Sequence, residues 1–316
     1  MMMTEDTKPI HQRLYDADAT VRRIAVLGLL DSDEDDILPL LITALQDLDA
    51  GVRVEAARLL EGYETSTVVR ALISVLDDPD SEVVEAAATS LTELKERAMA
   101  EHLLEALTGQ VTPVTQAALL RALRALRAPD AFEPAMMALE SNSSAVRCAA
   151  IGVLGYLRNP AALPEIALIA ATDPDSEARR IAVGALGFAP DSAIVIPTLI
   201  AALRDVYWQV REEATTTLGK LKATEVTNEL VLSMADDYWQ VRVKATRSLG
   251  KLKARAALPA LIEALSHEMS NLRKEAAIAL GEVGDVEAIP ALEKAMQDAD
   301  PDVRKLAHLA LNKILK

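Results

Sequence analysis

The chain has 316 residues, a formal net charge of −15, and 51% apolar but only 3% aromatic residues. The apolar fraction is too high for a disordered acidic chain, and no apolar run reaches the roughly 18 residues of a membrane span. The negative charge disfavours nucleic acid and anionic membranes as partners, because both bind positive protein surfaces. A single cysteine, Cys148, allows neither an internal disulfide nor a cysteine-based zinc site. We therefore expect a cytoplasmic protein.

Residues 1–9 are expected to form an N-terminal tail, and they lack the apolar segment of a secretory signal. The first 100 residues hold 9 basic and 21 acidic residues, a net charge of −12, and Asp31 to Asp36 is the densest acidic stretch. An acidic N-terminal part favours a partner with a basic patch, because charge complementarity speeds encounter.

A repeat of 31 or 32 residues fills the rest of the chain. Each copy has an apolar anchor residue, usually followed by arginine, and a marker leucine eight or nine residues later. The anchors are Val21, Val52, Val83, Val114, Val146, Ala178, Val210, Val241, Leu272 and Val303. The marker leucines are Leu29, Leu60, Leu91, Leu123, Leu154, Leu186, Leu218, Leu249, Leu280 and Leu311. Ten copies result, and the fourth is the least regular because its leucine comes one place late.

Each copy is predicted to form two helices. The first resembles AALPALIEAL (Ala256 to Leu265), where a proline near the start loses no helical hydrogen bond. The second resembles VRCAAIGVLG (Val146 to Gly155), with apolar residues 0, 4, 7 and 8 places from the anchor on one buried stripe. Acidic turns such as DDPDSE (Asp77 to Glu82) cap the second helix. Glycines after the marker leucine are expected to end it, at Gly155, Gly187, Gly219, Gly250 and Gly281.

One copy cannot bury its own apolar face, so consecutive copies must stack. The sequence therefore predicts an all-α protein, an α-solenoid of about ten two-helix repeats that forms a single domain over residues 10–316. The second helices are expected to line its concave side.

The repeat resembles the HEAT repeat, in the short form known as the phycobilisome-lyase HEAT-like repeat. The resemblance rests on strings such as DVYWQVREEATTTLGKL (Asp205 to Leu221) and on the PALIEAL-type helix, and it covers almost the whole chain. It implies the solenoid fold. Its implications for function are broader, because the family includes bilin lyases and isomerases, deoxyhypusine hydroxylase and many binding scaffolds.

The hydroxylase alternative is disfavoured because that family places His-Glu pairs two and three residues after the anchor, as iron ligands. The ten residues two places after the anchors include no histidine. A bilin-lyase role stays open as an analogy, since the resemblance transfers no specific residue. A DNA-binding HEAT protein needs a basic groove, which the charge of −15 disfavours.

Isolated residues give little sign of catalysis. The histidines His11, His102, His267 and His308 have no metal-ligand spacing, and Cys148 has no paired histidine. We expect no catalytic residue, no metal and no cofactor. The recurring arginine after the anchor is interpreted as an ion-pair ladder with the turn aspartates, for example Asp205 with Arg211 or Asp236 with Arg242. Val84 and Thr115 interrupt this ladder, so residues 80–125 are a candidate hinge.

The most distinctive motif is a duplicated Tyr-Trp-Gln string. Both tryptophans and two of the five tyrosines of the chain lie in two turns 31 residues apart. Large amphipathic rings dominate protein interfaces, whereas the repeat core needs only leucine and alanine. Covering of neighbouring turns is the alternative role. The candidate partner-binding residues, including groove-facing positions of the following helices, are Tyr207, Trp208, Gln209, Glu212, Thr216, Tyr238, Trp239, Gln240, Val243 and Arg247.

These observations favour a non-catalytic scaffold or adaptor that binds a partner protein on its concave face. A bilin lyase-like enzyme or chaperone accessory is the main alternative. We expect a monomer that binds neither nucleic acid nor membrane.

Overall fold

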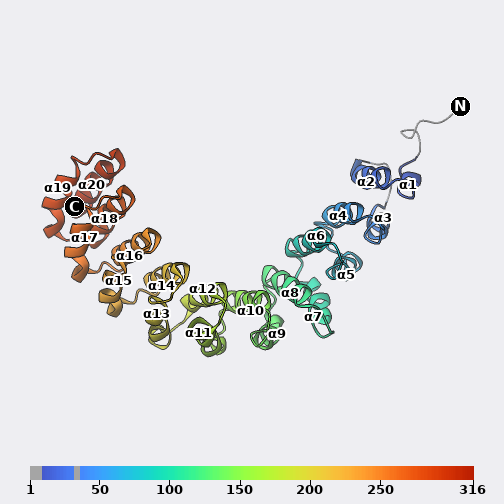
Figure 1. Cartoon of the computed structure of the whole chain (residues 1–316), viewed down its shortest axis with the longest axis horizontal. Coiled ribbons are helices and arrows are strands. Elements are labelled where there is room, and N and C mark those ends of the chain that lie inside the picture. Colours follow the sequence, from blue (N-terminus) through green and yellow to red (C-terminus); the bar gives the residue numbers. More distant parts are fainter. Residues whose placement is uncertain (1–8, 32–35) are drawn as a thin grey trace. The chain divides into compact units, whose positions relative to one another are not determined.

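The structure, a computed structural model, describes residues 9–31 and 36–316. Over these residues it contains helices and turns and no strand, and the helices form ten consecutive pairs (Figure 1). The prediction of an all-α repeat solenoid is confirmed. Most of the expected tail and the centre of the acidic stretch, residues 32–35, lie outside the described residues.

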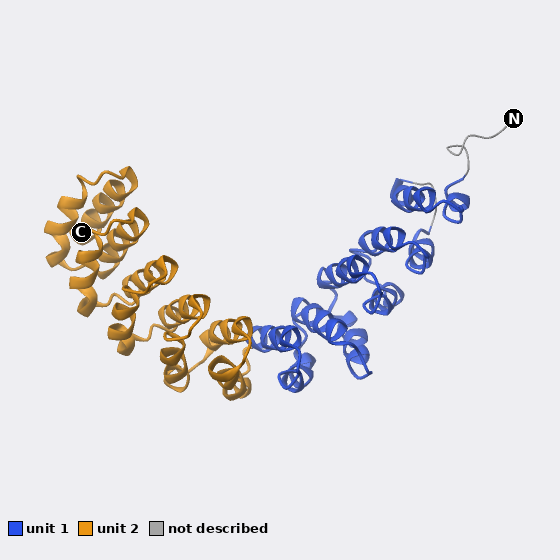
Figure 2. Cartoon of the chain, in the orientation of Figure 1, with its two compact units in different colours: residues 1–157 blue, residues 158–316 orange. Residues whose placement is uncertain are grey.

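The chain divides into two compact units, residues 1–157 and 158–316 (Figure 2). In unit 1 the first helices of the repeats are α1 (Ile10–Arg13), α3 (Leu38–Ala44), α5 (Ser66–Ser74), α7 (Ala100–Leu107) and α9 (Phe132–Ala138). The second helices are α2 (Ala19–Leu27), α4 (Ala50–Leu59), α6 (Ser81–Thr92), α8 (Pro113–Ala125) and α10 (Ser144–Leu157).

Unit 2 has the same plan. Its first helices are α11 (Leu163–Thr172), α13 (Ile196–Ala202), α15 (Thr227–Ser233), α17 (Leu258–Ala264) and α19 (Ile289–Ala295). Its second helices are α12 (Ser176–Ala185), α14 (Trp208–Leu221), α16 (Trp239–Lys251), α18 (Ser270–Val283) and α20 (Pro301–Ile314). Within each unit the second helices form one layer and the first helices the other (Figure 1). The expectation of one continuous domain over residues 10–316 stays a prediction.

The second helices are amphipathic because the fourth and eighth residues after the anchor are buried, and the anchor itself is buried in every repeat but the first. The residue four places after the anchor is a fully buried alanine in nine repeats: Ala25, Ala56, Ala87, Ala150, Ala182, Ala214, Ala245, Ala276 and Ala307. A small, fully buried side chain at this position suits closely packed helices, and the marker leucine is buried in the same way. Short helices thereby gain the stability that they would lack alone.

The predicted anchor of the fourth repeat is wrong by one residue. Val114 is 58% exposed, whereas Thr115 is 2% exposed and occupies the core position. Helix α8 begins at Pro113 after the capping residue Thr112, which lies three residues before Thr115, as Asp80 lies three residues before Val83. With Thr115 as anchor, Leu123 lies eight residues later, as in the other repeats.

The glycines after the marker leucines are predicted to end the second helices, and this is wrong for Gly219, Gly250 and Gly281. Helices α14, α16 and α18 continue past Gly219, Gly250 and Gly281. These glycines instead permit close contact between neighbouring second helices. A Cβ atom on Gly250 would lie 2.7 Å from the Cα atom of Ala279 in α18. The helices end close to the third residue after each glycine, where Lys222, Lys253 and Gly284 have positive φ angles.

A ladder of arginine clamps connects successive repeats. The guanidinium of Arg53 donates to the main-chain oxygen of Asp47 in its own turn (2.7 Å), and to both carboxylate oxygens of Asp78 in the next turn (2.7 and 2.8 Å). The same two-sided contact recurs in the pairs Arg22–Asp47, Arg179–Asp205, Arg211–Asp236 and Arg273–Asp298. Each arginine therefore fixes one turn relative to the next.

The predicted pairing within a repeat is thus wrong. Arg211 donates to the main-chain oxygen of Asp205 at 2.8 Å, but its side-chain partner is Asp236 of the next repeat. Arg242 likewise donates to the main-chain oxygen of Asp236. The carboxylate position after Arg242 is occupied by His267, and the buried Nε of Arg242 has no hydrogen-bond partner among the described residues.

The Gly250→Ala variant is expected to lose about 1–3 kcal/mol of unfolding free energy, because the added methyl group would overlap the backbone of α18. Urea unfolding followed by circular dichroism measures this. Gly187→Ala is the matched control, since its Cβ would meet Thr217 at an ordinary 3.4 Å. Equal stability of both variants would contradict the close-contact role.

The ladder also predicts acid sensitivity. Hydrogen bonds from the arginines hold the pKa values of Asp47, Asp78 and Asp298 below the ordinary value of 3.8. A lowered folded-state pKa stabilises the fold above the unfolded-state pKa, and this contribution is lost as pH falls through the folded-state value. Stability should therefore fall steeply below about pH 4.

Asp78→Asn is expected to lower stability at pH 7. It should also reduce the loss of stability between pH 4 and pH 2, because asparagine has no carboxylate to protonate. Thermal unfolding between pH 2 and pH 7 measures both effects. Glu140→Gln, an exposed carboxylate outside the ladder, serves as the control. If Asp78→Asn lost as much stability at low pH as the unchanged chain, the arginine clamp would be excluded as the source of the acid sensitivity.

Candidate functional site

The two Tyr-Trp turns differ from most other turns at the helix cap. In six other repeats an aspartate or threonine at this position accepts a hydrogen bond from the helix N-terminus: Asp18, Asp49, Asp80, Thr112, Asp175 and Asp300. Met269, at the cap of α18, makes no such bond. Tyr207 and Tyr238 occupy the cap positions of α14 and α16 and make no such bond. Replacing a capping side chain typically costs about 1 kcal/mol. In these two turns a tyrosine ring therefore replaces a side chain that would stabilise the helix.

The rings form a row across two neighbouring repeats, and two ladder arginines lie against it. The rings of Trp208 and Tyr238 are stacked, with centroids 5.6 Å apart and planes inclined by 15°. The guanidinium of Arg179 lies 5.5 Å from the Tyr207 ring centre, and that of Arg211 lies 5.5 Å from the Tyr238 ring centre. Because Arg179 and Arg211 belong to the ladder, each tyrosine lies against an arginine that is already fixed.

This row leaves a large apolar area in solvent. We define the Tyr–Trp surface as Val206, Tyr207, Trp208, Tyr238 and Trp239. Val206 is 83% exposed, and Tyr207, Tyr238 and Trp239 are 44–50% exposed. Only Trp208 is half-buried, under its stacked partner. Contiguous exposed apolar area of this kind commonly marks an interaction site. The stacking also provides the neighbour-covering role that was the alternative interpretation, so the rings partly support one another.

The predicted residues of the following helices are less available. Glu212 in α14 lies 3.7 Å from the ammonium of Lys244 in α16, and Thr216 donates to the main-chain oxygen of Glu212. Arg247 donates to both oxygens of the buried carboxylate Glu275 (2.9 and 2.7 Å), and this raises the pKa of Arg247. These three side chains thus connect residues of the scaffold.

The remaining predicted residues differ in exposure. Gln209 is exposed and Val243 is half-buried. The Oε1 atom of Gln240 is buried without a hydrogen-bond partner among the described residues. Val206, the most exposed apolar residue of the surface, is not among the predicted residues. Its position gives no signal in the sequence, because the other turns carry apolar, polar, proline and acidic residues there. The ten-residue set as a partner site stays a prediction.

The histidine and acidic residues form no evident metal centre. No group of three or more potential ligands is placed to hold a metal ion within residues 9–31 and 36–316. His267 occupies a turn position, where its Nδ1 accepts the main-chain N–H of Met269 at 3.0 Å. In the part of the chain that the structure describes, no helix is long and apolar enough to cross a membrane.

The chain belongs to the HEAT repeat family. The family described as HEAT repeats matches residues 7–92, 41–124, 100–187, 165–239 and 227–312, which together span almost the whole sequence. No curated protein matches the chain.

Solved structures share the fold at low sequence identity. An engineered protein is 21% identical with a TM-score of 0.56, and the match covers 99% of this chain and all of the engineered one. YibA of E. coli is 21% identical with a TM-score of 0.55, over 96% of this chain and all of YibA. A chain from the complex of Kap95p with RanGDP is 14% identical with a TM-score of 0.65, over 96% of this chain and 49% of that one. The likeness establishes an α-solenoid resembling karyopherins.

Tyr207→Asp should restore a capping side chain at α14 while removing the cation–π contact with Arg179. A cap is worth about 1 kcal/mol and an exposed cation–π contact about 0.5–1 kcal/mol, so we expect unchanged or slightly raised unfolding free energy. Chemical denaturation measures it, with Asp300→Tyr as the reciprocal control that should destabilise α20. A large loss in Tyr207→Asp would show that the ring is a structural element.

Proposed function

We propose that this protein is a non-catalytic scaffold or adaptor that recognises a partner protein through the Tyr–Trp surface. The observation that carries the proposal is the replacement of two helix caps by tyrosines whose rings stay about half exposed. Rings that are held in place lose little side-chain entropy on binding, which is why tyrosine and tryptophan dominate binding hot spots.

The structural neighbours support a binding role by analogy. One is described as the karyopherin Kap121p bound to the extreme C-terminus of the protein phosphatase Cdc14p, with 15% identity and a TM-score of 0.57 over 96% of this chain and 41% of that one. Solenoids offer extended surfaces of stacked repeats for such contacts. We also propose the finer assignment to the phycobilisome-lyase HEAT-like type, on the strength of the VR-x-x-A-x-x-x-LG strings.

The partner is proposed to be a protein with a basic patch. The N-terminal 100 residues, with 9 basic and 21 acidic residues, would attract it electrostatically, and the Tyr–Trp surface would supply the apolar contact. We propose a cytoplasmic monomer that contacts neither nucleic acid nor membrane, on the basis of its acidity and its single cysteine.

Trp208→Ala combined with Trp239→Ala is expected to reduce partner capture about tenfold or more, since two central rings would be lost from the interface. Affinity capture from a lysate of the source cells, quantified by mass spectrometry, measures the loss, and circular dichroism checks that helicity is kept. Tyr156→Ala is the matched control, because Tyr156 is 43% exposed and lies against Arg127 but belongs to unit 1. Unchanged capture by the double variant would exclude the Tyr–Trp surface as the site.

A further inference from the structure

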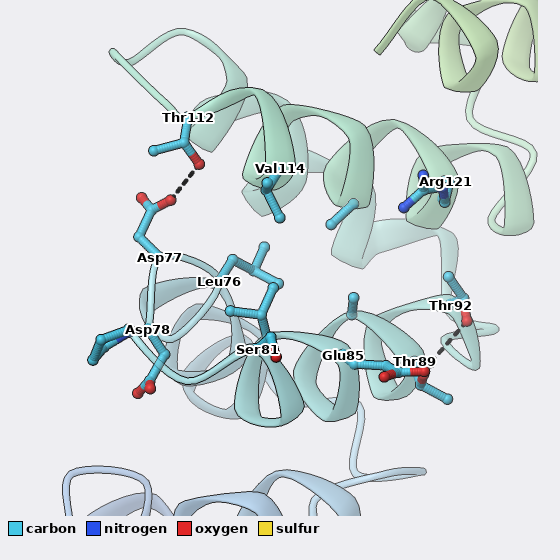
Figure 3. Close-up of a pocket in the computed structure, with 14 residues that line it drawn as sticks. Leu76, Asp77, Asp78, Ser81, Glu85, Thr89, Thr92, Thr112, Val114 and Arg121 are labelled. Carbon is cyan, nitrogen blue, oxygen red and sulfur yellow. Dashed lines mark hydrogen bonds between the residues drawn. The ribbon is translucent and has the colours of Figure 1, made fainter. Parts of the chain in front are cut away.

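A groove of about 720 Å³ lies between α6 and α8 in unit 1 (Figure 3). Its floor and walls carry the apolar side chains of Leu76, Val84, Ala88, Val114 and Ala118. Val114 is 58% exposed at the mouth. The volume falls within the range of ligand pockets, roughly 300–1,000 Å³. None of these residues belongs to the Tyr–Trp surface.

The groove exists where the arginine ladder is interrupted. Val84 occupies the position of the clamp arginine, and Gln110 occupies the position of the carboxylate that it would bind. Both members of the rung are therefore absent, and the short valine does not bridge the two turns. The hydroxyl of Thr115 instead donates to the main-chain oxygen of Leu76 at 3.1 Å, deep in the core. The turns stay connected while the space above Val84 is left open.

The charged residues around the groove have a negative excess. Asp77 accepts hydrogen bonds from the hydroxyls of Thr112 and Thr115, but no described cation lies within ion-pair distance of it. Glu85 is exposed and likewise forms no ion pair with a described residue. Arg121 is the single basic residue of the lining. Asp78 is already neutralised by Arg53.

We propose that this groove binds an extended peptide segment with aliphatic side chains flanked by lysine or arginine. Aliphatic side chains match the walls of the groove, and the basic residues would pair with Asp77 and Glu85. The eight residues from Val114 to Arg121 span about 10 Å of helix, which matches about three residues of an extended chain. A fatty acid or another anionic amphiphile would face the excess of carboxylates, so it fits less well.

The site is independent of the proposed Tyr–Trp function. It lies in another compact unit and shares no residue with that surface. Loss of peptide binding in the groove would therefore leave partner capture by the Tyr–Trp surface unaffected, and the reverse also holds.

The test uses the full chain and a capped, fluorescein-labelled peptide, Lys-Leu-Val-Val-Leu-Lys, with fluorescence anisotropy as the readout. Two control peptides replace lysine by glutamate or the aliphatic residues by serine. We expect saturable binding of the first peptide only. Val84→Arg combined with Gln110→Asp should rebuild the rung and fill the groove, and it should weaken binding about tenfold or more.

Further variants separate charge from folding. Glu85→Gln, at an exposed position, should weaken peptide binding without changing the stability of the protein. Arg121→Ala removes a positive charge from the lining, so peptide binding should stay the same or become tighter. Trp208→Ala with Trp239→Ala should bind the peptide normally. The proposal is overturned by absent binding, by preference for the glutamate peptide, or by equal affinity of the rebuilt variant. Self-association of the chain that the rebuilt variant abolishes, seen by sedimentation, would also overturn it in favour of a second copy as occupant.

Discussion

The arginine clamp between neighbouring turns is the interaction on which the order of the repeats depends. Each clamp joins a main-chain oxygen of its own turn to a carboxylate of the next, with the guanidinium largely buried. Charge-assisted bidentate bonds are both stronger and more directional than neutral ones. Apolar stacking alone would tolerate sliding of one helix pair over another, because leucine and alanine surfaces offer little directional preference. The clamp fixes the register that the glycine–alanine contacts between second helices then require.

The two proposed binding features both relate to this ladder. The Arg179–Asp205 and Arg211–Asp236 rungs are kept, and these two arginines support the tyrosines that replace the helix caps. In the third and fourth repeats the rung is lost on both sides, and a groove opens between α6 and α8. A regular rung thus supports exposed aromatic rings, and a missing rung leaves a groove. Function in a repeat protein is expected at such departures, because the regular positions serve the scaffold.

The fold could be predicted from the sequence because its period is carried by buried residues, the anchor valines and the marker leucines. The clustering of the aromatic residues could be predicted for the same reason, since Tyr207 and Tyr238 are 31 residues apart. Three details could not. The partner of Arg211 was misplaced by one repeat, because every turn offers an equivalent aspartate. The anchor of the fourth repeat was misplaced because a threonine, Thr115, occupies the buried position and the apolar residue beside it, Val114, is exposed. The role of Gly250 depends on Ala279, 29 residues away, and only the packed structure brings them together.

A double-mutant cycle on Arg211 and Asp236 tests the clamp most directly. The unfolding free energies of Arg211→Ala, Asp236→Ala and the double variant are compared with that of the unchanged chain. Each single variant leaves one charged group without its partner, so the account predicts a coupling energy of about 1–3 kcal/mol between the two side chains. Additive effects, with coupling within about 0.3 kcal/mol of zero, would contradict the claim that this ion pair fixes one repeat to the next.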